Sequence, residues 1–349
     1  MRTKLLIIIL SSLCSAFAFA QEPRFSWNAG VITEGQWNIT KGKAAWANLI
    51  SADAGVRLWE GAQFDLAAIS TYGVNASAVD DRQDFSNINA PNFGFRLTHL
   101  GLGQTLADGK VLLFLGLRGA DEDYCSTDYA GVFTGSSYGG LPTITENTGV
   151  PMFPVSALGF HVEYRPTARW TFRESLYNGR ASDRLDEQFR FRPGRDGILN
   201  YGSAMYEVAK GESTPATYTL GYNLATRQAS GERVDFGLWT VVEQPLFRIG
   251  RAQLGLLAQG AVQFTKNAAG KGYWAGAVVM EDVTANGGVL GLGVNRAYYA
   301  DGNETDVELT FNCPIGAGFS VQPALHCIHT DGSTVMAGQL RVIYEIGSK

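Results

Sequence analysis

Hydrophobic and polar residues alternate with a period of two along much of the chain, and this alternation restricts the fold more than any other feature. From Arg233 to Phe264 the alternate side chains are apolar and those between them are polar, on both sides of a turn at 245–250. Only β-strands convert such a period into two faces, so the stretch predicts an antiparallel hairpin. Each side is about ten residues long, enough to cross a bilayer when tilted. A soluble sandwich has the same alternation, so the pattern alone leaves membrane and water open.

The first twenty residues decide between these environments. Arg2 and Lys4 precede the apolar run 5–10, and a small-residue site ending at Ala20 stands before Gln21. This order is typical of a secretory signal peptide, so we predict that 1–20 is removed and that 21–349 forms one exported domain. No later segment has the roughly eighteen consecutive apolar residues that a membrane helix needs.

Composition fits an exported β-protein and argues against several kinds of site. Glycine contributes 42 of 349 residues, which suits many turns and closely packed strands. Without Arg2 and Lys4 the chain has 26 basic and 33 acidic residues, a net charge of −7, which argues against nucleic acid as a partner. The four histidines lack metal-ligand spacing and no phosphate loop is present, so we expect no metal and no cofactor. Cys125 is an odd thiol whose role the sequence leaves open.

Sixteen segments have the character of strands. An even number is what a single-chain outer-membrane barrel with both ends on one side requires. The candidates are 24–39, 49–59, 64–74, 93–104, 110–120, 158–165, 170–179, 201–209, 216–224, 233–244, 251–264, 271–280, 289–296, 306–313, 319–329 and 335–346.

The connections sort by length. Those after even-numbered strands are short, whereas the three longest, 75–92, 121–157 and 180–200, all follow odd-numbered strands. Short periplasmic turns with long outer loops are typical of a bacterial outer-membrane barrel. In hydrocarbon a sheet of this size must close, and at sixteen strands its lumen becomes an aqueous channel unless something plugs it. The predicted fold is an all-β, transmembrane, antiparallel up-and-down barrel of about sixteen strands.

One residue breaks the alternation. Glu174 falls on the same face as Trp170, Phe172 and Leu176, which are apolar. Either a bulge shifts the register of this strand, or its outer face packs against protein instead of lipid.

Five stretches, in the same order along the chain, resemble one known family. The most specific is DFGLWTVVEQPLFR, from Asp235 to Arg248. The others are 101–117, 151–179, PGRDGILNYGSAMYE at 193–207, and the end of the chain from Val289. Together they resemble the carbohydrate-selective outer-membrane porins of the OprB type. The chain is short for that family and ends on Ile346-Gly347-Ser348-Lys349 instead of an aromatic residue.

The resemblance implies a barrel in the bacterial outer membrane through which carbohydrates diffuse passively. In porins the third outer loop folds inward and narrows the lumen, and here that connection is the longest. We therefore expect a constriction that involves Asp121, Glu122, Asp123 and Asp128; the alternative is an exposed acidic loop.

Selectivity for sugars needs hydrogen-bonding groups for hydroxyls and aromatic platforms for ring faces. A mixed ring of Arg and Glu can bond hydroxyls, whereas a wholly anionic ring chiefly passes cations. The residues predicted to face the lumen are Arg57, Trp59, Arg118, His161, Glu163, Arg173, Glu207, Asp235, Trp239 and Glu243. For each, a solvated charge or ring without a role in selectivity is the alternative.

Other functions remain open at this point. A general or ion-selective porin has the same fold, and a plugged barrel can act as an enzyme or an adhesin. Residues 135–139 match the G-x-S-x-G pattern, but no strand-to-helix elbow is predicted around them, so we expect no enzyme. The expected partners are carbohydrate solutes, outer-membrane lipids and, if the barrel is a trimer and not a monomer, further copies of the chain.

Overall fold

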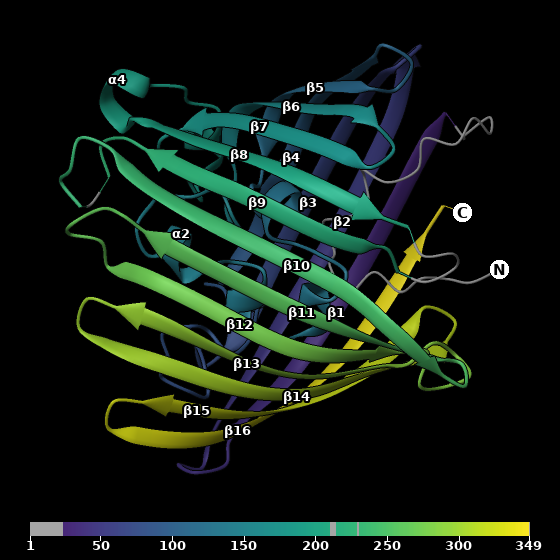
Figure 1. The fold of residues 1–349 in the computed structure, drawn as a ribbon, viewed down its shortest axis with the longest axis vertical. Coiled ribbons are helices and arrows are strands. Elements are labelled where there is room, and N and C mark those ends of the chain that lie inside the picture. The colour runs from purple at the N-terminus through teal and green to yellow at the C-terminus, as the bar shows by residue number, and fades with distance from the viewer. Residues whose placement is uncertain (1–23, 210–213, 229, 349) are drawn as a thin grey trace.

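Strands make up most of the chain, and they close into one barrel (Figure 1). The computed structural model describes residues 24–209, 214–228 and 230–348, so the predicted signal peptide lies outside the described part. Within those residues sixteen antiparallel strands follow chain order, and β1 pairs with β16, Asn28 opposite Gly347, to close the sheet. The predicted fold class and strand number are confirmed.

The elements are bounded as follows. The strands are β1 (Phe25–Asn38), β2 (Lys43–Trp59), β3 (Ala62–Val74), β4 (Phe93–Leu106), β5 (Val111–Arg118), β6 (Ala157–Thr167), β7 (Trp170–Asn178), β8 (Ile198–Val208), β9 (Ala216–Ala225), β10 (Asp235–Ile249), β11 (Ala252–Gln263), β12 (Gly270–Glu281), β13 (Val289–Tyr299), β14 (Gly302–Gly316), β15 (Phe319–Thr330) and β16 (Ser333–Gly347). The short helices are α1 (Asp121–Tyr124), η1 (Ala130–Val132), η2 (Ser136–Tyr138), α2 (Pro142–Thr145), α3 (Leu185–Gln188) and α4 (Pro193–Asp196). None of these described helices is long and apolar enough to span a membrane.

The two faces of the sheet differ in chemistry, as the period of two predicts. On β10, Phe236 and Leu238 point outward and are exposed, whereas Asp235, Trp239 and Glu243 point inward and are buried. The same division recurs around the barrel, so the outer surface carries a belt of exposed apolar side chains. The belt includes Ile50, Leu66, Leu115, Phe160, Leu220, Leu256, Leu292, Leu309, Leu325 and Leu340. An apolar outside and a polar inside suit a barrel whose outer surface meets lipid.

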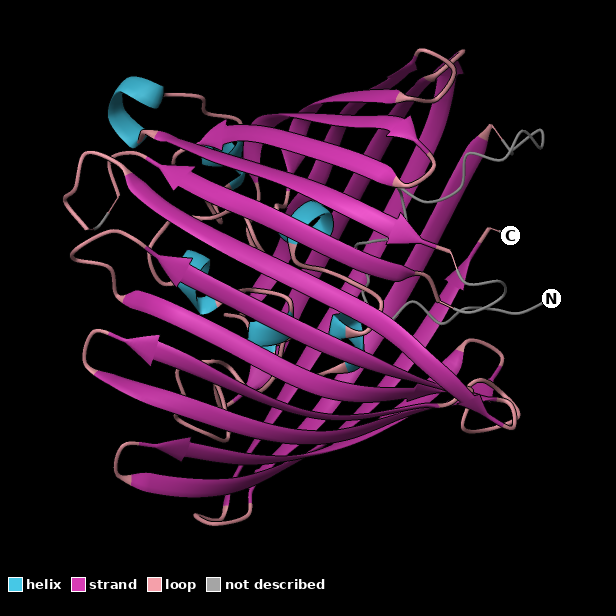
Figure 2. Ribbon diagram, viewed as in Figure 1, coloured by secondary structure: helices cyan, strands magenta, loops and turns pink. Residues whose placement is uncertain are grey.

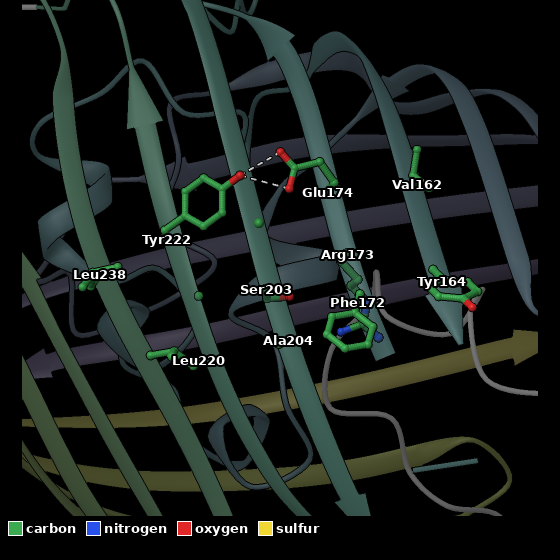
Figure 3. Close-up of a pocket in the computed structure, with 12 residues that line it drawn as sticks. Val162, Tyr164, Phe172, Arg173, Glu174, Ser203, Ala204, Leu220, Tyr222 and Leu238 are labelled. Carbon is green, nitrogen blue, oxygen red and sulfur yellow. Dashed lines mark hydrogen bonds between the residues drawn. The ribbon is translucent and has the colours of Figure 1, made fainter. Parts of the chain in front are cut away.

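The outer position of Glu174 is not caused by a bulge. Pairing between β7 and β8 is continuous along the whole of β7, and the irregularity between β6 and β7 lies between Tyr164 and Thr167. Figure 3 shows the Glu174 carboxylate on the outer face beside Tyr222, whose hydroxyl donates to it at 2.8 Å. The Asn200 amide donates at 2.5 Å. The bulge hypothesis is therefore wrong.

Glu174 and Tyr222 line a groove of about 430 Å³ on the outer wall, among apolar side chains of β6 to β10 (Figure 3). The groove depends on a missing side chain at Gly202. A Cβ at that position would lie 2.3 Å from the Tyr222 ring and 2.6 Å from a Glu174 oxygen. Glycine therefore allows the carboxylate and the phenol to meet across β8.

Candidate substrate pathway

The 119–156 connection folds into the barrel instead of projecting from it, and Figure 2 shows its short helices enclosed by the strands. Its main chain is bound by side chains that point inward from the wall. The Glu243 carboxylate accepts the N–H groups of Tyr129 (2.6 Å) and Ala130 (3.3 Å). Amide groups of Gln322 and Gln259 donate to the carbonyl oxygens of Val132 (2.9 Å) and Tyr138 (2.8 Å). Wall side chains thus satisfy main-chain groups that would otherwise be buried without partners.

The 75–92 connection also enters the lumen, which the sequence did not indicate. Glu304 accepts the main-chain N–H groups of Arg82 (3.0 Å) and Gln83 (2.9 Å), and Gln339 donates to the carbonyl oxygen of Phe85 (2.5 Å). Residues 84 and 87 of this connection join it to the 119–156 connection through two main-chain hydrogen bonds. Asn87 N–H donates to Thr134 (2.7 Å), and Ser136 N–H donates to Asp84 (2.9 Å).

A cavity of about 430 Å³ lies where the two connections meet the wall. Charged groups of both signs line it: the guanidinium groups of Arg82 and Arg341, and the carboxyl groups of Asp84, Asp121 and Glu146. The remaining lining includes Gln83, Asn87, Asn89, Phe133, Ser136, Phe153 and Tyr299. This combination offers hydrogen-bond donors, acceptors and aromatic faces in one place.

The two guanidinium groups are held differently. Arg82 lies over the Tyr299 ring, 3.8 Å from its centroid, forms an ion pair with Asp301, and has Glu146 at 4.0 Å. Arg341 is buried on β16 and binds the Glu34 carboxylate at 2.6 Å. The same Nη2 group also donates to the Asn87 side-chain oxygen at 2.9 Å, which links the wall to the 75–92 connection.

Several carboxyl groups in these connections have displaced pKa values, and those of two are raised to neutrality or above. Burial raises the pKa of Asp121 to about 7, and the neighbouring charge of Glu122 adds to the effect. Burial, together with the charges of Glu304 and Asp84, raises the pKa of Asp81 to about 8. Both groups therefore change charge near neutral pH.

Four of the predicted lumen residues meet in one network with one predicted constriction residue. Arg118 of β5 binds Asp123 of α1 through two hydrogen bonds of 2.6 and 2.5 Å. His161 of β6 lies 3.5 Å from the same carboxylate. Arg173 of β7 donates to the Asp123 carbonyl oxygen (3.1 Å) and to Glu163 (2.7 Å). Despite its burial, the pKa of Asp123 is held well below its ordinary value, chiefly by Arg118. These groups attach α1 to the wall.

Three predicted residues of β10 face inward but lie outside the cavity. Glu243 binds the 119–156 main chain, as described above. Trp239 is buried, with its ring edge-on to Tyr124 at 6.2 Å, and Asp235 accepts a hydrogen bond from the Ser230 hydroxyl (3.0 Å). An indole buried in this way packs against the inner connection and offers no open face to a solute.

Of the remaining lumen predictions, Arg57 and Glu207 lie on inward-facing positions near the end of the barrel that carries the chain termini. The prediction for Trp59 is wrong. A bulge at Leu58 moves Trp59 out of the inward alternation, so that it pairs with Ala62, and its indole N–H donates to Gln104 at 2.9 Å. The side chain is 56 % exposed on the outer surface. The alternation alone carried no sign of the extra residue.

The other constriction candidates separate in the structure. Asp121 lines the cavity, and Glu122 is nearly buried with an oxygen 3.7 Å from His99. Asp128 is exposed and outside the cavity lining. Cys125 follows α1 in the same connection and is fully buried, which raises the pKa of its thiol to about 12.

Sequence reasoning missed several residues that line the cavity. The sequence did indicate that Arg341 faces the lumen, because Arg341 lies on the polar face of its strand between the apolar residues Leu340 and Val342. Nothing in the sequence indicated Arg82, because it lies in a connection without periodicity. The G-x-S-x-G stretch forms the turn η2 inside the barrel and not a strand-to-helix elbow.

Asp306, Glu308 and His326 have ligand-type atoms within 4.8 Å of one another on the inner face of β14 and β15. The protein itself uses these atoms. His326 Nδ1 binds Asp306 at 2.8 Å, and both Glu308 oxygens accept N–H groups of the 119–156 connection. The cluster is a set of ion pairs and hydrogen bonds.

A family model shows the family of this chain, and solved structures show its fold. A family model described as "Carbohydrate-selective porin, OprB family" matches residues 51–277, more than half of the chain. No curated protein matches. Among solved structures, OprB of Pseudomonas putida at high pH has a TM-score of 0.78 and 18 % identity, covering 92 % of this chain and 94 % of that one. The low-pH structure has a TM-score of 0.65 and 19 % identity, covering 92 % of both chains.

A porin of different selectivity shares the architecture. The anion-selective porin of Comamonas acidovorans has a TM-score of 0.60 and 10 % identity, covering 92 % of this chain and 98 % of that one. At such identities these likenesses show the barrel fold alone.

Proposed function

This chain belongs to the OprB family of carbohydrate-selective porins, and we propose that it is a passive diffusion channel for mono- or small oligosaccharides across the bacterial outer membrane. The observation that carries the proposal is the lumen cavity. Its lining combines two guanidinium groups, three carboxyl groups, side-chain amides and aromatic rings.

The chemistry of the cavity fits a neutral polyol better than an ion. A sugar hydroxyl both donates and accepts, so it can bind a carboxylate and a guanidinium group at the same time. The exposed ring of an aromatic side chain packs against the apolar face of a pyranose. A channel that selects ions by charge should have one sign around its constriction, whereas this lining has both.

Passive diffusion agrees with the cavity in a further respect. Substrate must leave as readily as it enters, so its binding groups must be few and weak. Arg341 and Arg82 already bind Glu34 and Asp301, so a passing hydroxyl competes with an existing ion pair. On this proposal residues 1–20 direct export and are cleaved, and the apolar belt lies in the outer membrane.

Liposome swelling tests the proposal. Purified, refolded protein is placed in vesicles, and swelling rates are compared for glucose, a disaccharide, amino acids and charged solutes of similar size. We expect sugars to enter faster than other solutes of equal size. Equal rates for all small solutes would make the protein a general porin, and an absence of swelling would remove the channel.

A substitution in the cavity tests whether the preference for sugars arises there. Arg82→Ala removes the guanidinium group over Tyr299 and its ion pair with Asp301. We expect the preference for glucose over an amino acid of equal size to fall. Lys271→Ala is the matched control, because Lys271 is an exposed cation at the start of β12 outside the cavity lining.

A further inference from the structure

A buried cluster on the inner wall holds the 119–156 connection at one point. On β14, Glu304, Asp306 and Glu308 face inward and are buried, and Glu308 pairs directly with His326 of β15. Glu308 Oε1 accepts the main-chain N–H (2.7 Å) and the hydroxyl (2.9 Å) of Thr134, and Oε2 accepts the N–H of Gly135 (3.1 Å). One carboxylate thus receives three hydrogen bonds from two consecutive residues.

The neighbouring histidine completes this arrangement. Its Nδ1 lies 2.8 Å from Asp306, and its Nε2 lies 3.0 Å from the Thr134 hydroxyl. The Thr134 hydroxyl donates to Glu308, so at this contact it can only accept, and an Asp306 carboxylate also only accepts. When Asp306 and Glu308 are both ionised, these two contacts require His326 to donate from both ring nitrogens and so to carry a positive charge between the carboxylates. Thr134 is bonded from both sides, which fixes its position relative to the wall.

Thr134 and the nearby Ser136 connect the two inner segments to each other. The Thr134 carbonyl oxygen accepts the N–H of Asn87, and Ser136, next to Gly135, donates to Asp84. Phe85, between Asp84 and Asn87, lies edge-on to the His326 ring with centroids 5.4 Å apart. Asp84, Asn87, Gly135 and Ser136 all line the cavity. Any shift of Thr134 therefore moves the cavity wall.

We propose that Glu308 is a positioning residue for transport: with His326 it holds Thr134 and Gly135, and through them both inner segments, at the separation that sets the size limit of the channel. This proposal rests on the proposed function, because a size limit has meaning only for a conducting lumen. Glu308 itself is fully buried and does not line the cavity, so it acts through the segments that it binds.

Glu308→Gln tests the proposal with little change of volume. An amide has one oxygen and one NH2 group, so one of the two loop N–H groups faces a donor instead of an acceptor. We expect the ratio of disaccharide to glucose swelling to rise about twofold or more, with larger and noisier single-channel conductance. A purely structural effect would reduce the amount of folded barrel and lower both rates equally, leaving the ratio unchanged.

Two further variants keep the test decisive. Thr134→Val removes the bridging hydroxyl and leaves the wall residues unchanged. We expect it to raise the ratio of disaccharide to glucose swelling as well, so it serves as the test if Glu308→Gln fails to fold. Glu345→Gln is the matched control, an inward carboxylate at the terminus-bearing end of β16, distant along the barrel from Thr134.

Hydrogen exchange of a peptide spanning 130–137 tests the positioning role independently of whether the protein prefers sugars. Faster exchange in Glu308→Gln than in Glu345→Gln supports the positioning role even if the wild-type protein proves not to prefer sugars. Unchanged exchange together with an unchanged swelling ratio in a folded Glu308→Gln barrel would overturn it.

Discussion

At the scale of single residues, Trp239 occupies space that Gly221 leaves free on the neighbouring strand β9. The two residues pair directly, and a Cβ at position 221 would lie 2.1 Å from a ring carbon of Trp239. The ring in turn contacts Tyr124 at the end of α1. Wall, ring and inner connection thus form one packed layer, in which no atom can be added without a shift.

Gly221→Ala should therefore destabilise the barrel. Overpacking of a filled interior costs about 1–3 kcal/mol, because side chains or backbone must move. The free energy of unfolding is measured by urea titration in lipid vesicles. Gly276→Ala on β12 is the control, since a Cβ there meets nothing within 4 Å. Equal unfolding free energies for the two variants would contradict the packing described for Trp239.

At the scale of elements, α1 is attached to the wall by a buried charge pair. The Asp123 and Arg118 side chains are 3 % and 5 % exposed, and their two hydrogen bonds are short. A helix of four residues has little stability of its own, so its place depends on contacts with β5 to β7.

Arg118→Met should leave the Asp123 carboxylate buried without its main partner. Loss of one member of such a pair costs about 3–5 kcal/mol, whereas replacing both members by apolar residues is often neutral. We expect the double variant Arg118→Met, Asp123→Leu to recover most of the lost unfolding free energy. A double variant as unstable as the single one would show that shape, and not the unpaired charge, causes the loss.

The elements also show how far sequence reasoning extends. The sixteen strands were predictable, because an apolar outer face and a polar inner face impose a period of two on most of them. The bulge at Leu58 was not, since β2 ends at Trp59 and no further residues follow in which the reversed alternation would show. Glu243 was predicted to face inward, but the sequence pattern is the same whether an inward carboxylate is solvated by water or accepts a main-chain N–H. The path of the 75–92 connection depends on such partners, so it appeared only in the structure.

At the scale of the whole molecule, the two inner connections bring carboxyl groups with raised pKa values into the lumen of the barrel. The pKa of Asp121 is about 7 and that of Asp81 about 8, both raised mainly by burial. Each raised value means that the carboxyl is neutral below that pH and negative above it. The lumen near the cavity therefore becomes more negative as pH rises from about 6 to about 9.

This change should appear in ion selectivity. The permeability ratio of K⁺ to Cl⁻, obtained from reversal potentials across a planar bilayer, should increase about twofold between pH 6 and pH 9, because a negative constriction favours cations. Asp121→Asn should remove part of the increase, since its amide stays neutral throughout. Asp128→Asn, an exposed position in the same connection outside the cavity lining, should keep the wild-type response. If the wild-type ratio is constant over this range, or if both variants behave alike, the ionisation of Asp121 does not act on permeating ions, and this prediction is wrong.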